Sequence, residues 1–228
     1  MTRRTKVLIS ASLAALMVVG TAAVAIAAPI LSLTATRDVV TYPQPTWLKV
    51  NASDEGASVA TTGTIQYLPI GATEWKKLRT VAASRTAEGT VTVPVAPYWL
   101  KSTTAFKATA EGLESEVVTV SVRARLSAPI APRTVKAGRH VTIRGFIWPR
   151  HAAGSRPVEV KFWKWESGDW VYKGSAHPKI VRRWGDGSKW QFTRHVHGAD
   201  KGKWRMQVYH EDAKHVASMS RFGYVRVR

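Results

Sequence analysis

Hydrophobic and polar residues alternate along most of the chain, in short runs bounded by Gly, Pro, Asp or Ser. The first half contains "LSLTA", "WLKVNA", "GTIQYL", "TVTVPV", "TAFKATA" and "EVVTVSVRA". The second half contains "HVTIRGF", "VEVKFWKW", "DWVYKG", "SKWQFTRHV", "KWRMQVYH" and "FGYVRVR". Alternation with a period of two is typical of strands that bury one face, and no run keeps the 3.6-residue period of an amphipathic helix. The pattern predicts an all-β protein.

The alternating runs repeat. "GTIQYLPIGATEWKKL" aligns without a gap with "VEVKFWKWESGDWVYK", which places Ile65, Tyr67 and Trp75 on Val160, Phe162 and Trp170. Further along, "STTAFKATA" matches "DKGKWRMQV" and places Phe106 on Trp204. Both halves end in a strand of alternating valines. These matches predict two copies of one β unit, at residues 28–124 and 125–228, joined near "RARLSAPIAP".

The first 27 residues have the organisation of a signal peptide. "MTRRTK" is basic, the next 21 residues are apolar and rich in alanine, and Ala25-Ile26-Ala27 offers the small-x-small cleavage pattern. An uncleaved membrane anchor is the alternative, because the apolar run approaches the length that spans a bilayer. In both cases the remaining chain is exported, so we expect a secreted protein that can associate with the cell surface. A membrane is a partner only if the segment is not cleaved.

About seven short strands per 100 residues is typical of an immunoglobulin-like β-sandwich. The succession of V-x-V-x-F, G-x-W, an Asp-Gly turn, K-W-x-F and K-G-K-W-R-x-x-V resembles the bacterial Ig-like domain repeats of secreted and surface actinobacterial proteins. The resemblance covers nearly all of residues 30–228. It implies two tandem Ig-like β-sandwich domains after the signal peptide, and an extracellular adhesion, spacer or binding role without catalytic residues. The chain has no cysteine, so the disulfide-pinned version of the fold is excluded.

The stretch "VEVKFWKWESGDWVYKG" predicts a hairpin with two apolar faces. A four-residue turn at 166–169 sets Trp165 opposite Trp170 and Trp163 opposite Tyr172, all on one face. The other face carries Val158, Val160 and Phe162, which match core positions of the first copy. The first copy has Gln66 and Leu68 where the second has Lys161 and Trp163, so we expect the aromatic face to belong to the second copy.

The two halves differ strongly in charge. Residues 28–123 hold nine Lys/Arg and eight Asp/Glu, a net charge of +1, whereas residues 124–228 hold 22 Lys/Arg and seven Asp/Glu, a net charge of +15. Such a basic half attracts polyanions, although a solvated basic face that binds every anion weakly explains the charge equally well.

These observations favour a non-catalytic binding or adhesion module whose second domain engages an anionic cell-envelope polymer or glycan. We expect tryptophans to stack on sugar rings and basic residues to pair with anions. The candidate residues are Trp163, Trp165, Trp148, Arg182, Arg183, Arg194 and Lys203. The alternative is a structural spacer or protein–protein interaction protein of the cell surface without a glycan ligand. Nucleic acid is not an expected partner.

Other chemistry has little support in the sequence. His195 and His197 share an exposed strand face, and His210 and His215 in the next connection could approach them to bind zinc. No cysteine or carboxylate spacing supports such a site, so we predict no metal site and no cofactor. There is no Gly-x-Ser-x-Gly or His-Glu-x-x-His motif, and "HED" at 210–212 is predicted to lie in a loop, so the chain is not expected to be an enzyme.

Overall fold

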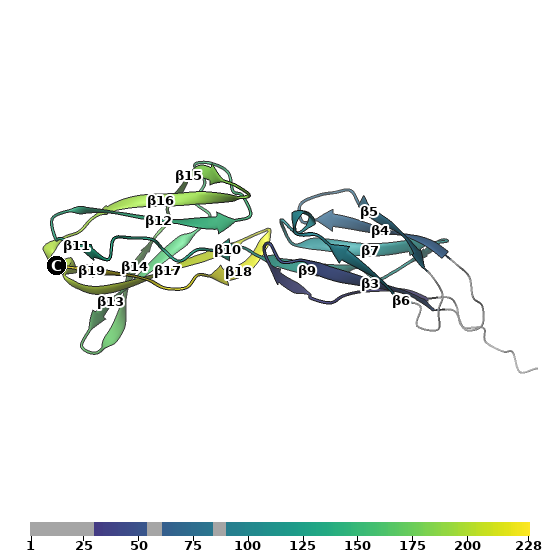
Figure 1. The fold of residues 1–228 in the computed structure, drawn as a ribbon, viewed down its shortest axis with the longest axis horizontal. Coiled ribbons are helices and arrows are strands. Elements are labelled where there is room, and N and C mark those ends of the chain that lie inside the picture. The colour runs from purple at the N-terminus through teal and green to yellow at the C-terminus, as the bar shows by residue number, and fades with distance from the viewer. Residues whose placement is uncertain (1–29, 54–60, 84–89) are drawn as a thin grey trace, which may run out of the picture.

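The computed structural model describes residues 30–53, 61–83 and 90–228, so the predicted signal peptide at 1–27 lies outside the described residues. Within these ranges the protein is all-β, with two short 3₁₀ helices and no α-helix. No helix in the described ranges is both long and apolar enough to cross a membrane. Figure 1 shows two β-rich lobes that lie end to end. We call residues 30–123 the first lobe and residues 125–228 the second lobe.

The described residues of the first lobe form nine strands and one 3₁₀ helix. They are β1 (Ile30–Ala35), β2 (Val39–Thr41), β3 (Thr46–Ser53), β4 (Thr61–Pro69), β5 (Lys76–Ala83), β6 (Thr90–Val95), η1 (Pro97–Trp99), β7 (Thr104–Ala110), β8 (Leu113–Glu114) and β9 (Val118–Arg123). The second lobe contains β10 (Arg125–Leu126), β11 (Thr134–Val135), β12 (His140–Trp148), β13 (Glu159–Glu166), β14 (Asp169–Ala176), β15 (Lys179–Trp184), β16 (Gly187–His195), η2 (Gly198–Asp200), β17 (Gly202–Asp212), β18 (His215–Met219) and β19 (Gly223–Val227).

The strands form three sheets, and the order of pairing recurs along the chain. One small sheet has the order β1-β3-β6 and another has the order β10-β12-β16-β15. The remaining twelve strands form one large mixed sheet. In the first lobe, β4 pairs with β5 and β7, and β2 runs parallel to β9. In the second lobe, β13 pairs with β14 and β17, and β11 runs parallel to β19.

The strand register corrects one detail of the repeat alignment. Tyr67 lies opposite Phe106, and Phe162, which aligns with Tyr67, lies opposite Met206. Phe106 therefore corresponds to Met206, and its predicted match to Trp204 was wrong by two residues. A shift of two keeps every side chain on its own face of the sheet, so the alternation of the sequence does not reveal it.

Buried side chains form two hydrophobic clusters, one in each lobe. The first includes Leu48, Ile65 and Phe106, and the second includes Val160 and Trp190, all of them fully buried. Trp148 of the second lobe packs against the first cluster. Each cluster lies between a small sheet and its part of the large sheet, so burial of apolar side chains supplies the main stabilisation of both lobes without disulfides.

The hairpin of β13 and β14 has the predicted register. Trp165 lies opposite Trp170 and Trp163 lies opposite Tyr172. Ser167 and Gly168 form the turn with φ values of 50° and 90°, and positive φ at both central residues is the geometry that follows the twist of a tight hairpin. Val158, Val160 and Phe162 are buried, which confirms the core face of the prediction.

The two lobes are joined through the large sheet. Val216 of β18 pairs in parallel with Arg123 of β9. Next to this pair, the amide of Thr103 donates a hydrogen bond of 2.8 Å to the carbonyl oxygen of Lys214. The turn between β17 and β18 therefore contacts the backbone of the first lobe.

Candidate functional site

The outward faces of β14, β13, β17 and β19 carry a continuous set of aromatic and basic side chains. Alternation along β17 separates the buried Trp204 and Met206 from the outward Lys203 and Arg205. We call the outward set the aromatic face. Its members on the strands are Trp163, Trp165, Trp170, Tyr172, Lys203, Arg205 and Tyr224. Phe222, which directly precedes β19, packs against Trp163 and Arg205 and completes the set.

The rings of the aromatic face contact one another from strand to strand. Trp163 packs edge-on against Tyr172 and Phe222, with 5.9 Å between ring centroids in both pairs. Trp165 lies 5.2 Å from Trp170 on the neighbouring strand. Edge-to-face packing holds such rings in place. Trp165 is 40% exposed and Tyr172 is 52% exposed, so this rigid surface is open to solvent.

Arg205 lies in the middle of the aromatic face. Its guanidinium carbon is 5.4 Å from the ring centroid of Trp163, 4.9 Å from that of Trp170 and 4.5 Å from that of Phe222. Within the described part of the chain, no carboxylate forms an ion pair with Arg205, and its Nε atom is buried without a hydrogen-bond partner. The charge of Arg205 is therefore stacked on aromatic rings and has no carboxylate counter-ion among the described residues.

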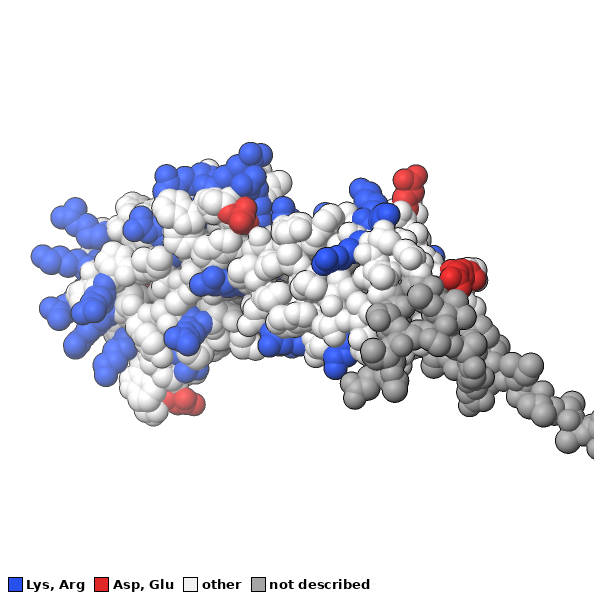
Figure 2. Space-filling view, turned by 45° about the vertical axis from the view of Figure 1, so that its right-hand side comes forward, with Lys and Arg blue, Asp and Glu red and all other residues white. Residues whose placement is uncertain are grey.

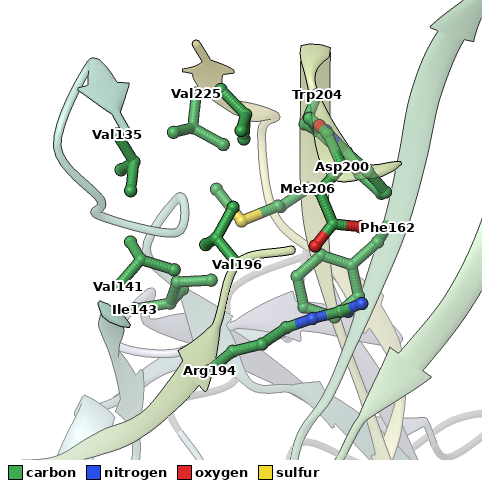
Figure 3. Close-up of a pocket in the computed structure, with 11 residues that line it drawn as sticks. Val135, Val141, Ile143, Phe162, Arg194, Val196, Asp200, Trp204, Met206 and Val225 are labelled. Carbon is green, nitrogen blue, oxygen red and sulfur yellow. The ribbon is translucent and has the colours of Figure 1, made fainter. Parts of the chain in front are cut away.

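The structure brings three of the seven predicted site residues together on the aromatic face: Trp163, Trp165 and Lys203. The other four are Trp148, Arg182, Arg183 and Arg194, which belong to β12, β15 and β16 of the other sheet. Arg182 stacks over Trp184 at 5.0 Å. Arg194 lies over the core ring of Phe162, at the edge of a small apolar pocket (Figure 3). Arg205 was not among the predicted site residues, because its position opposite Trp163 depends on the pairing of β13 with β17, which the alternation along β17 does not reveal.

Basic side chains crowd the second lobe. Figure 2 shows many Lys and Arg side chains on this lobe and few Asp and Glu. One of the few carboxylates, Glu166, pairs with Lys173 and Lys164, and the hydrogen bond from Lys173 holds the pKa of Glu166 below its usual value. The negative charge of Glu166 is thus already compensated by two lysines, and an anion that approaches the aromatic face meets a positive surface.

Three histidines and an aspartate meet at the other end of the second lobe, next to the first lobe. We call His151, His210, Asp212 and His215 the histidine cluster, and their ligand atoms all lie within 4.8 Å of one another. His151 follows β12, His210 and Asp212 end β17, and His215 begins β18. The prediction that "HED" at 210–212 lies in a loop is wrong, because these are the last residues of a strand.

The predicted grouping of histidines is not what the structure shows. His195 contacts His140 and His197, with ring centroids 5.0 Å and 4.6 Å apart, and all three are exposed. His140 begins β12, whereas His151 follows its end, so the nine residues of that strand separate the two groups by roughly 25 Å. No sequence pattern indicates that His151 joins His210 and His215, because contact between distant strands depends on sheet order.

Burial sets the protonation of the histidine cluster. Desolvation lowers the pKa values of His151 and His210, so both rings are neutral at pH 7. Burial alone would raise the pKa of Asp212, but hydrogen bonds from the Lys214 amide and from His215 outweigh it, so the pKa of Asp212 is lowered. His151 and His210 therefore present neutral imidazoles beside the carboxylate of Asp212.

No protein-family model matches this chain, and a search of curated proteins also finds no match. The resemblance to Ig-like repeats therefore remains a prediction from the sequence.

Proposed function

We propose that this protein is an exported, non-catalytic binding module that holds an anionic polysaccharide or cell-wall polymer on its aromatic face. We also infer that its lobes are tandem Ig-like β-sandwich domains at residues 28–124 and 125–228, an inference that the recurring order of strand pairing supports. In this proposal the second domain supplies the ligand site and the protein acts at the cell surface.

The observation that carries the proposal is the environment of Arg205. Its guanidinium stacks on three aromatic rings and has no carboxylate partner in the described chain. A sugar ring presents an apolar C–H face that packs on exposed aromatic rings, and a carboxylate or phosphate on that sugar would pair with the guanidinium edge. Lys203, and Arg226 next to Tyr224, would hold further anionic groups of the same polymer.

The extended shape of the surface fits a polymer better than a small ligand. The aromatic face runs across four strands and is exposed at both Trp165 and Tyr224. The same exposed rings would also suit a protein partner, since aromatic residues and arginine are enriched in interfaces. The uncompensated cations favour the anionic polymer, and protein interaction or a spacer role is the alternative.

The test compares two matched double variants of the exported chain. Trp165→Ala with Arg205→Gln removes one aromatic and one cation from the aromatic face. Trp184→Ala with Arg182→Gln removes the same residue types, and the same charge, from the stacked pair on β15. Retention is measured on acidic and neutral polysaccharide columns at two salt concentrations.

We expect the wild type and the β15 variant to bind the acidic column, and the aromatic-face variant to elute early. Equal retention of both variants would reduce the site to unspecific charge attraction, which depends on net charge alone. A salt-insensitive dimer in sedimentation that the aromatic-face variant abolishes would instead favour the protein-interaction alternative.

A further inference from the structure

The histidine cluster has the arrangement of a metal site, and it is separate from the aromatic face. We propose that His151, His210, Asp212 and His215 bind one divalent transition-metal ion of the zinc class. The proposal goes beyond the polymer-binding function and does not rest on it. It also reverses our expectation from the sequence that the chain has no metal site.

The orientation of the three imidazole rings is the first argument. Each ring has one nitrogen close to a backbone carbonyl oxygen: His151 Nδ1 to Pro149 at 2.9 Å, His210 Nδ1 to Pro157 at 2.6 Å, and His215 Nε2 to Lys101 at 2.9 Å. A carbonyl oxygen only accepts, so these nitrogens carry the hydrogen. The other nitrogens are left to point into the cluster. Metal-binding histidines are oriented by such outer hydrogen bonds.

The inward-facing atoms do not satisfy one another. His151 Nε2 is buried without a hydrogen-bond partner, and it lies 3.5 Å from Asp212 Oδ2. His210 Nε2 lies 3.5 Å from the same oxygen and 3.5 Å from His215 Nδ1. A single proton between His215 Nδ1 and Asp212 Oδ1, which are 2.9 Å apart, would form one hydrogen bond. In the other contacts of the cluster, the lone pairs of two acceptor atoms would still face each other. A cation at the centre, in place of that proton, would satisfy all four groups.

The carboxylate is held in place for this role. Asp212 Oδ1 accepts hydrogen bonds of 2.8 Å from the amides of Lys214 and His215, which close the turn between β17 and β18. Oδ2 faces His151 and His210 and receives no hydrogen bond from a described residue. One oxygen therefore fixes the side chain and the other is left to coordinate.

The spacing of the four groups fits a small tetrahedral ion. Zinc–nitrogen bonds of about 2.0–2.1 Å place the ligand atoms of a tetrahedron roughly 3.3 Å apart. Three of the separations between ligand atoms are 3.5 Å, and all of them lie within 4.8 Å, so binding needs a contraction of at most about 1.5 Å at the longest separation. Three imidazoles with one carboxylate suit zinc, cobalt, nickel or copper, whereas calcium and magnesium prefer sites built of oxygen. A cleft of about 670 Å³ that reaches His151, Asp212 and His215 gives the ion a path from solvent.

The site would also fasten the two lobes together. His215 is oriented by the carbonyl oxygen of Lys101 in the first lobe, and the neighbouring Lys214 accepts a hydrogen bond from Thr103. A metal ion that fixes His215 therefore fixes the contact between the lobes.

The experiment titrates the exported chain, stripped with a chelator, with Zn²⁺ in a calorimeter and with Co²⁺ followed by visible absorption. We expect one ion per chain and the intense absorption of tetrahedral cobalt. Asp212→Asn and His151→Gln should each weaken Zn²⁺ binding by about 100-fold or more. This is a larger effect than the 10- to 100-fold loss that is typical when a residue that only hydrogen-bonds to a metal ligand is changed. His195→Ala is the matched control, since it alters a group of three contacting histidines that lack these carbonyl contacts.

Unchanged Zn²⁺ affinity in Asp212→Asn and His151→Gln, or absence of stoichiometric binding by the wild type, would overturn the proposal. Loss of Zn²⁺ binding in His195→Ala would also overturn the proposal, because it would show that the ion binds to the exposed histidines. Circular dichroism of each metal-free variant separates loss of a ligand from loss of the fold. His151→Gln is informative here because His151 lies in a connection and not in the buried part of a strand.

Discussion

The two lobes share an order of strand pairing and differ in what their outer faces carry. Trp163 lies opposite Arg205 in the second lobe, and the corresponding pair in the first lobe is Leu68 opposite Ala105. All seven histidines and most of the net positive charge also belong to the second half of the chain. One β scaffold thus keeps its inward positions apolar while its outward positions vary freely, because only the inward ones build the core.

The largest expected effect is a loss of stability when an inward side chain is removed from the core. Trp190 is fully buried against Gly145, where a Cβ atom would lie only 2.3 Å from the indole ring. Trp190→Ala should lower the free energy of unfolding by about 3–5 kcal/mol, because a large cavity remains. Urea denaturation measures the loss. Trp184→Ala, at a tryptophan that is 47% exposed, should cost less than about 1 kcal/mol. Similar losses in the two variants would contradict the separation of core and surface.

The next effect concerns the outer face. Arg205→Ala gives the second lobe the residue that the first lobe has at the corresponding position. We expect the affinity for an acidic oligosaccharide to fall about 10- to 100-fold, since a hydrogen bond to a charged group contributes roughly 1.5–3 kcal/mol. Calorimetry measures the affinity, with Arg182→Ala as the control of equal charge. Equal losses would show that the position of the cation does not matter.

A smaller effect is expected at the tip of the hairpin that carries the aromatic face. Gly168 has a φ of 90°, so Gly168→Ala should cost about 1–2 kcal/mol of stability through strain in the left-handed region. Gly198 has an ordinary φ, and a Cβ atom added there would meet no other atom within 4 Å, so Gly198→Ala should stay within about 0.5 kcal/mol. Chemical denaturation of both variants checks the difference, and a neutral Gly168→Ala would argue against this turn.

The last effect is a dependence on pH that should be confined to the second lobe. Burial lowers the pKa values of His151 and His210 below 6.5, so the unfolded chain binds more protons than the folded one as the pH falls below about 6.5. The metal-free protein should therefore lose stability from pH 6.5 downward, as the pH passes through the folded pKa values. Hydrogen exchange of β17 and β3 peptides at neutral and mildly acidic pH distinguishes the lobes. Equal acid sensitivity in β3, from the lobe without histidines, would contradict this assignment.

The strands and the hairpin register could be predicted because they depend on local patterns. Alternation placed Val160 and Phe162 inward, and the turn chemistry paired Trp163 with Tyr172. The partners of those strands depend on sheet order, which the alternation does not encode. For this reason Arg205 was overlooked as the neighbour of Trp163, and His151 was not linked to His210. The repeat alignment was also wrong by two residues at Phe106, because a shift of two leaves each side chain on the same face of the sheet.

Trp148 has a consequence for the order in which the chain folds. The ring lies beyond the predicted domain boundary, yet it packs on the hydrophobic cluster of the first lobe. During synthesis, residues 30–123 emerge before Trp148 is made, so the first lobe first forms with part of its apolar surface still uncovered. The arrival of β12 covers that surface and draws the start of the second lobe onto the first. The indole of Trp148 would thus be the last side chain to cover the core of the first lobe and one of the first to hold the second lobe against it.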